Sequence, residues 1–356
     1  MTFLDRRLAF RLTLISVVVI VAVAVPVILI RQAMRPHPAS AVLPEPSSSP
    51  TPDSKIPTIG ATAQCPAGPR IANATQLKQA LTSVKPGSVM NLSAGTFSGQ
   101  FEANVSGTAG SPITLCGSRD AVIDGGDIKQ GYALHLNTVD YWRVIGFSIK
   151  GAQKGVVTDH AHHLLIQGLF VHDVGDEGIH LREFSTDNIV DGNTIRNTGL
   201  LNAKFGEGIY VGTAHSNWCK YTDCKPDNSD RNVIRNNDIS ATTAENIDIK
   251  EGTTGGVIEN NRLSGEGMAA ATAWINVKGN EWTIVGNIGQ HSVKDGFQVH
   301  RVYKGWGERN VFRGNQAEVN GPGFGYYVQS ASLATIIGCD NTAVGAARGL
   351  TNTKCA

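Results

Sequence analysis

Residues 256–261 read Gly256-Val257-Ile258-Glu259-Asn260-Asn261, an aliphatic segment that runs into an Asn turn. The same pattern, with Gly or Asn at the turn, occurs seven more times, at Ile145-Gly146-Phe147, Gln167-Gly168-Leu169, Asp191-Gly192-Asn193, Arg235-Asn236-Asn237, Val285-Gly286-Asn287, Arg313-Gly314-Asn315 and Ile337-Gly338-Cys339. Successive copies lie 22 to 28 residues apart, except for one gap of 44. A repeat this short, made of β-branched strands and tight corners, is typical of one turn of a parallel β-helix rather than of a helical or leucine-rich repeat. The sequence therefore predicts an all-β solenoid.

The composition agrees with a chain of many corners and few surface helices. Of 356 residues 40 are Gly, and only 17% are charged. The formal net charge of +1 leaves no basic footprint, so we expect no nucleic-acid partner. Any function that depends on charge must come from a local cluster.

The six cysteines predict an oxidising compartment, because their number is even and all lie beyond the apolar N-terminal stretch. Proximity in the sequence favours three disulfides, although six cysteines allow 15 pairings. The favoured pairs are Cys65 with Cys116, Cys219 with Cys224, and Cys339 with Cys355. Their spacings are not those of a zinc site.

The N-terminus has the features of an export signal. The segment 12–30 contains no charged residue and follows Arg6, Arg7 and Arg11; its 19 residues are long enough to span a bilayer. We expect a basic cytoplasmic region at 1–11, a transmembrane signal anchor at 12–30, a Pro/Ser-rich linker at 31–63 and the folded domain at 64–356. Ala39-Ser40-Ala41 resembles a cleavage site, so secretion after cleavage is the alternative to a membrane-anchored extracytoplasmic domain.

The segment between linker and repeats predicts a cap. Residues 75–84 have the pattern of a short amphipathic helix, which would cover the open end of the solenoid. The stretches 85–97 (Lys85-Pro86-Gly87 to Gly95-Thr96-Phe97) and 110–115 (Gly110-Ser111-Pro112-Ile113-Thr114-Leu115) follow. They resemble the opening of the pectate-lyase-like β-helix superfamily, and in particular of the alginate lyases and chondroitinase B. This resemblance implies a right-handed parallel β-helix.

Strands that precede each repeat place polar residues in register. Because side chains alternate across a strand, residues such as Ile247 and Ile249 point into the core and their neighbours point outward. The outward set, here called the polar strip, comprises His180, Arg182, Tyr210, Asp248, Lys250, Asn276, Lys278, Gln298, His300, Tyr327 and Gln329. An acidic column stands beside it, at Glu177, Glu207, Glu245 and Asp295. The alternative is an ordinary surface of weak ion pairs. The asparagines at 193, 237, 261, 287 and 315 instead predict a structural ladder at one corner.

The segment Glu245-Asn246-Ile247-Asp248-Ile249-Lys250 resembles the catalytic strand of the alginate lyase and chondroitinase B family. The family places there an acid that helps to hold calcium and, five residues later, a lysine that removes a proton. The resemblance continues through residues 256–261 and 277–280. Two departures are Thr243, where the family tends to have Glu, and Lys278, where it has an Arg that assists catalysis.

The resemblance implies a lyase acting on an acidic polysaccharide with Ca²⁺ as cofactor. We expect Glu207, Glu245 and Asp248 to supply metal ligands. Lys250 would be the base, with its pKa lowered by Lys278 and by a bound cation. Three cationic side chains would bind substrate carboxylates: Arg182, Lys278 and His300. His300 or Tyr210 would donate a proton to the leaving oxygen.

The gap of 44 residues contains an insertion at 213–230 that carries Trp218 and Tyr221. Long loops in compact repeats are usually functional, so this one is expected to form a wall of the substrate groove, although a surface excursion is the alternative. Further substrate contacts are expected from His180, Asn276, Gln298, Trp218 and Tyr327.

Several function classes fit these patterns. The first is an exported, monomeric polysaccharide lyase that cleaves a uronate polymer by β-elimination. A C5-epimerase would use much the same residues, and a glycoside hydrolase shares the fold, although neither Asn-Thr-Asp nor Gly-His-Gly is present. The non-enzyme alternative is a glycan-binding or cell-wall-associated β-helix.

Overall fold

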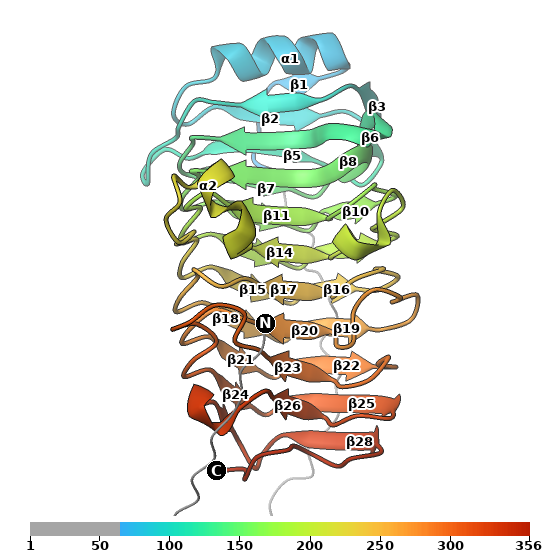
Figure 1. The fold of residues 1–356 in the computed structure, drawn as a ribbon. Coiled ribbons are helices and arrows are strands. Elements are labelled where there is room, and N and C mark those ends of the chain that lie inside the picture. Colours follow the sequence, from blue (N-terminus) through green and yellow to red (C-terminus); the bar gives the residue numbers. More distant parts are fainter. Residues whose placement is uncertain (1–64) are drawn as a thin grey trace, which may run out of the picture. The chain divides into compact units, whose positions relative to one another are not determined.

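The computed structural model describes residues 65–356, which form a stack of parallel strands with helix α1 (Ala74–Ser83) at the N-terminal end (Figure 1). The parallel β-helix predicted from the repeats is confirmed. The predicted basic region, anchor and linker lie outside the described residues. Within residues 65–356 no helix has the length and apolar character needed to cross a membrane.

The repeat motifs end the strands of one 11-stranded parallel sheet, which receives one strand from each turn of the chain. Each Gly or Asn of the repeat directly follows such a strand, so the repeat marks a corner of the solenoid. The strands of this first sheet are β1 (Arg70–Ile71), β2 (Val89–Leu92), β5 (Ile113–Gly117), β7 (Trp142–Ile145), β9 (Leu165–Gln167), β12 (Ile189–Asp191), β15 (Val233–Arg235), β18 (Val257–Glu259), β21 (Thr283–Val285), β24 (Val311–Arg313) and β27 (Ile336–Ile337).

Two further stacks complete each turn, and the long strands β6 (Ala121–Asn137) and β8 (Ser148–Asp159) contribute to both. The second stack adds β3 (Gly95–Ser98), β10 (Phe170–His172), β13 (Thr194–Arg196), β16 (Asp238–Ile239), β19 (Arg262–Ser264), β22 (Ile288–Gln290), β25 (Gln316–Gly321) and β28 (Thr342–Ala346). The third stack adds β4 (Phe101–Ala103), β11 (Ile179–Arg182), β14 (Ile209–Val211), β17 (Ile247–Ile249), β20 (Ile275–Val277), β23 (Phe297–Val299) and β26 (Tyr326–Val328).

The core lies between the stacks and is built from the inward positions of the strands. Ile247 and Ile249 are fully buried, as the alternation predicts, and they pair in register with Ile209 and Val211 on the preceding turn. Such columns of aliphatic side chains bury apolar area on every turn, at about 25 cal/mol per Å². The regular core fixes the register of the outward side chains.

The asparagine ladder predicted at the corner is confirmed and is longer than expected. The side-chain Nδ2 of Asn193 donates to Oδ1 of Asn237 at 2.9 Å, and the same bond repeats through Asn261, Asn287 and Asn315 to Asn341. Every member is buried, and each Nδ2 from Asn193 onward also donates to a backbone carbonyl. The ladder therefore satisfies buried polar groups along the corner.

Helix α1 covers the first turn, within one residue of the predicted bounds at each end. Its N-cap is Asn73, whose Oδ1 accepts a hydrogen bond from the backbone N–H of Gln76 at 3.0 Å. Leu77 and Leu81 are buried on its inner face. The short helices η1 (Ala203–Phe205), η2 (His215–Asn217), α2 (Trp218–Tyr221) and η3 (Ala331–Leu333) lie in loops.

All three predicted disulfides are present. They join Cys65 to Cys116, Cys219 to Cys224, and Cys339 to Cys355. The first fixes the start of the described chain to β5, and the last fixes the C-terminal segment beside β27. The middle bond closes a short loop next to α2.

Candidate active site

The polar strip forms as predicted along the third stack. Strand pairing places His180, Tyr210, Asp248, Asn276, Gln298 and Tyr327 opposite one another on successive turns. The expectation that the strip is exposed is wrong for most of its members. His180 is 5% exposed and lies against the ring of Tyr210, whereas Asp248 is 1% exposed and lies between two lysines.

Asp248 is the centre of the strip. Its Oδ2 lies 2.6 Å from Nζ of Lys250 on its own turn, and its Oδ1 lies 2.5 Å from Nζ of Lys278 on the next turn. Burial alone would raise the pKa of Asp248, but the two ammonium groups hold it below its ordinary value. The lysines therefore share one side of the sheet and one carboxylate.

The expected lowering of the pKa of Lys250 is wrong. Burial would lower this pKa, but the Asp248 carboxylate, with Tyr210 and Glu207, raises it well above its ordinary value. The Lys250 ammonium also lies 4.7 Å from the ring centre of Tyr210. Lys250 is thus a cation in this structure, and Asp248 is the main reason.

Three carboxylates meet beside the lysines. One oxygen each from Glu207, Glu245 and Asp248 lie within 4.8 Å of one another. These are the residues expected to hold a metal, whereas Thr243 is not part of the group. Oε2 of Glu207 is buried without a hydrogen-bond partner, and burial, followed by the charges of Glu177 and Asp248, raises the pKa of Glu207 well above its ordinary value. An orphaned oxygen within a set of hard oxygen donors fits a calcium ion.

Asn276 links this acidic group to His300. Its Nδ2 donates to Oε1 of Glu245 at 3.0 Å, and its Oδ1 lies 2.9 Å from Nδ1 of His300. Because an amide oxygen only accepts, Nδ1 of His300 carries the proton. Burial and Lys278 lower the pKa of His300, which leaves Nε2 unprotonated at neutral pH. His300 therefore presents an unprotonated Nε2 next to the acidic group, and its expected role as proton donor stays a prediction.

Arg182 is paired within the protein, a contact that the sequence analysis did not predict. Its Nε and Nη2 donate to the two oxygens of Asp159 at 2.6 and 3.0 Å, and Nη2 also donates to the hydroxyl of Tyr132 at 3.0 Å. His135 contacts the same carboxylate at 2.8 Å. Asp159 pairs in register with Arg182, so the alternation rule applied one turn earlier would have revealed this partner.

His180 is likewise engaged within the protein rather than available to substrate. Its Nε2 donates to the carbonyl of Gly212 at 3.0 Å, and Lys154, which sequence reasoning missed, lies 3.4 Å from its Nδ1. Lys154 also pairs with Glu177 at 2.7 Å. Burial and the charge of Lys154 lower the pKa of His180 well below its ordinary value, so the ring is neutral.

The remaining expected substrate contacts divide into two groups. Gln298 is buried and donates to Asp295 at 2.8 Å, and Trp218 is 5% exposed, with its indole N–H donating to the carbonyl of Thr213 at 2.8 Å. Trp218 therefore supports its loop and presents no open ring face. Tyr327 is only half-buried, 5.5 Å from the Lys294 ammonium, and stays accessible at the C-terminal end of the strip.

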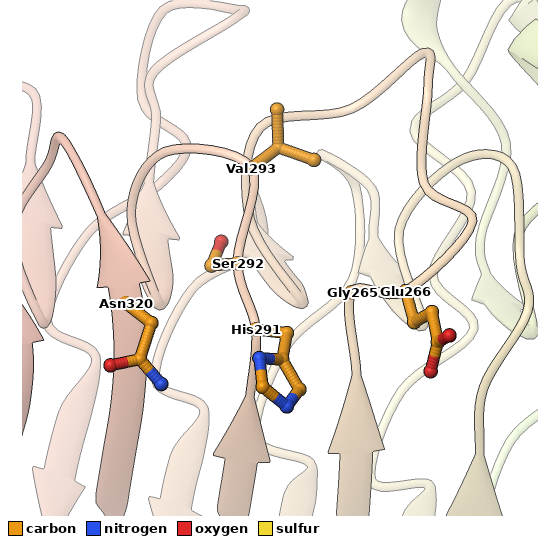
Figure 2. A pocket seen from close by; sticks show the side chains of 6 residues that line it. All are labelled: Gly265, Glu266, His291, Ser292, Val293 and Asn320. Carbon is orange, nitrogen blue, oxygen red and sulfur yellow. The ribbon is translucent and has the colours of Figure 1, made fainter.

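A separate hollow lies in the turns that lead from the second stack to the third (Figure 2). Figure 2 shows His291 and Asn320 on neighbouring turns, with Val293 on the loop beyond His291. No residue of the polar strip lines this hollow. The hollow lies before the strands of the third stack, whereas Lys250 and Lys278 come directly after the third-stack strands β17 and β20.

Comparison with known proteins agrees with the geometry. An alginate lyase from Paenibacillus sp. str. FPU-7 superposes with a TM-score of 0.75 and 38% identity, covering 81% of this chain and 98% of that one. The chain belongs to this alginate lyase family. The family resemblance inferred from the sequence is thereby confirmed, and the protein is a polysaccharide-active β-helix enzyme.

More distant structures share the fold of this alginate lyase family member. Pectate lyase Pel9A has 17% identity and a TM-score of 0.58, covering 78% of this chain and 72% of that one. The periplasmic alginate epimerase AlgG has 12% identity and a TM-score of 0.50, covering 75% and 61%. No protein-family model and no curated protein matches the chain.

Proposed function

We propose that this protein is an exported lyase that cleaves alginate, a uronate polymer, by β-elimination. The observation that carries the proposal is the buried cluster in which Asp248 joins Lys250 to Lys278 beside two further carboxylates. It occurs in a chain 38% identical to an alginate lyase. The family likeness supports the substrate, and the cluster supports the chemistry.

The cluster suits removal of a weakly acidic proton. The hydrogen on the carbon next to a uronate carboxylate leaves only if the extra negative charge is stabilised, and positioned cations provide that stabilisation. Lys278 is such a cation, and Lys250 is the proposed base. Lys250 must first lose its own proton to act as a base. Because Asp248 raises the pKa of Lys250, drawing Asp248 away would lower that pKa and favour the neutral amine, which can then accept the proton from the sugar carbon.

The three carboxylates extend this proposal to a metal. Glu207, Glu245 and Asp248 would hold a calcium ion, which when bound supplies positive charge to neutralise the substrate carboxylate. Asn276 fixes one of these ligands by its bond to Glu245. His300, held by the other end of the same amide, offers its unprotonated Nε2 as a second proton acceptor.

The alternative that the experiment must exclude is a β-helix of this family that binds glycan without catalysis. Lys250 is held as a cation by Asp248, and a lysine used only to bind acidic sugars would have this state. A binding protein would tolerate the loss of Lys250 far better than an enzyme.

Incubating the purified domain of residues 65–356 with alginate, pectate and glycosaminoglycans tests the proposal. Ultraviolet absorbance of unsaturated products on alginate is the expected result. Conversion of the C5 configuration without cleavage, followed by NMR, would identify an epimerase, and binding without either reaction would identify a glycan-binding protein.

Export is part of the proposal and is supported by the three disulfides, which persist in oxidising compartments. We propose a membrane-anchored extracytoplasmic enzyme, or a secreted one if the N-terminal segment is cleaved. Fractionation of cells that express the full chain, followed by N-terminal sequencing of the protein, distinguishes the two forms; recovery of reduced protein from the cytoplasm would contradict both.

A further inference from the structure

Two loops meet across the turns that carry the lysines. The first is the insertion at 213–230, which follows β14, and the second is the loop at 301–309, which follows β23. Strands β17 and β20 lie between them, so the loops start about 14 Å apart at a spacing of ~4.8 Å per turn. Their contact is aromatic. The ring of Tyr303 lies 5.2 Å from that of Trp218 and 5.1 Å from that of His215.

Each loop is fixed by a residue that closely follows one of the lysines. Glu251, next to Lys250, accepts hydrogen bonds from the backbone N–H and from Nδ1 of His215, both at 2.8 Å. Asn280, two residues after Lys278, donates to the carbonyl of Gly305 at 2.9 Å and accepts from the N–H of Glu308 at 2.8 Å. The aromatic contact is therefore tied to the same two turns that position the lysines.

The ring of Tyr303 packs against a buried ring and is itself largely exposed to solvent. Trp218 is 5% exposed and holds a fixed orientation through its bond to Thr213, whereas Tyr303 is 46% exposed. The loop that carries Tyr303 folds back on itself through an Arg301–Glu308 ion pair of 2.7 Å. An exposed aromatic face held rigid by a buried ring loses little entropy when a flat apolar surface stacks on it.

We infer that Tyr303 is a sugar-stacking residue, which binds a pyranose ring of the polymer at a subsite beyond Lys278 and His300. The inference rests on the proposed polysaccharide substrate. Sugar rings present apolar C–H faces that pack on aromatic rings, while their hydroxyls and carboxylates reach polar groups. Lys304, next in the chain, and His300, three residues earlier, are the nearest cationic or titratable residues along the sequence.

Affinity for sodium alginate, measured by calorimetry in a Lys250→Ala background, tests this inference. Adding Tyr303→Ala should weaken binding about tenfold, the loss expected for one aromatic contact. Adding Tyr303→Trp should preserve binding, because the larger ring also stacks. The matched control is Tyr141→Ala, since Tyr141 too lies against a histidine ring, that of His163, but beside the first sheet.

The outcomes separate this inference from the proposed function. Unchanged affinity in the Tyr303→Ala protein, with alginate cleaved by wild type, would overturn the stacking role and leave the lyase standing. Tenfold weaker binding by the Tyr303→Ala protein, with no cleavage by wild type, would support the stacking role and remove the lyase. Absence of any alginate binding would overturn both. Equal melting temperatures of the Tyr303→Ala and Tyr303→Trp proteins show that a loss of binding is not a loss of fold.

Discussion

Nζ of Lys278 lies 2.5 Å from Oδ1 of Asp248, a contact that joins two successive turns of the solenoid in a buried part of the polar strip. The second oxygen of the same carboxylate holds Lys250. One anion thus fixes two cations, which makes Asp248 the residue on which the charge state of the whole site depends.

Lys250→Ala should lower turnover on alginate by about 10² to 10⁴-fold, because it removes the proposed base while Lys278 remains to bind the substrate carboxylate. Initial rates and alginate affinity are the measurements. The control is Lys150→Ala, which removes a more exposed lysine paired with Asp124 on an early turn. Full activity of the Lys250→Ala protein would exclude Lys250 as the base.

Asp248→Asn should destabilise the protein by about 3 kcal/mol, since it leaves two largely buried ammonium groups without their carboxylate. It should also lower the pKa of Lys250, because Asp248 is the main group that raises it. A raised lysine pKa stabilises the fold below the ordinary lysine pKa, and that stability is lost as the pH rises through the folded value. Urea unfolding from about pH 9 to about pH 12, a window that starts below the ordinary lysine pKa and extends above it, should therefore show a smaller alkaline loss of stability in the variant than in wild type.

Glu207→Gln should raise the melting temperature at neutral pH in the absence of calcium. The pKa of Glu207 is raised, so this residue stabilises the fold below the ordinary glutamate pKa and that stability disappears as the pH rises through the folded value. Glutamine keeps the side chain neutral throughout, so the difference between the proteins should vanish near pH 4. Added calcium should stabilise wild type more than the variant.

The control for that experiment is Glu266→Gln, which changes an exposed carboxylate outside the acidic group. A Glu207→Gln protein that melts below wild type at pH 7 without calcium would show that the carboxylate is paired in solution.

Asn261→Ala should cost about 3 kcal/mol of unfolding free energy. It removes the acceptor for two N–H groups of Asn237 and leaves the buried carbonyl of Ile234 without its donor. Urea denaturation measures the loss, and the exposed Asn104→Ala should change stability by less than about 0.5 kcal/mol. Equal stabilities of the two variants would mean that the ladder does not contribute to the fold.

Much of the site could be predicted because a solenoid converts sequence spacing into spatial proximity. The register of Tyr210, Asp248 and Asn276 follows from alternation and from the repeat. The grouping of Glu207, Glu245 and Asp248 follows for the same reason. The pKa of Lys250 did not follow, because it depends on which neighbouring charge lies closest, and side-chain direction is not part of the repeat.

The sequence alone determined the parallel β-helix, the asparagine ladder and the sheet that carries the polar residues, since each depends on a period along the chain. Tertiary structure alone decided that Arg182 is held by Asp159 and that Trp218 supports Tyr303. Both contacts depend on the conformations of long side chains and irregular loops, and these conformations do not repeat along the sequence. Contacts within the repeat are set by backbone hydrogen bonds at a fixed spacing, whereas contacts between loops are set by packing that only the folded chain defines.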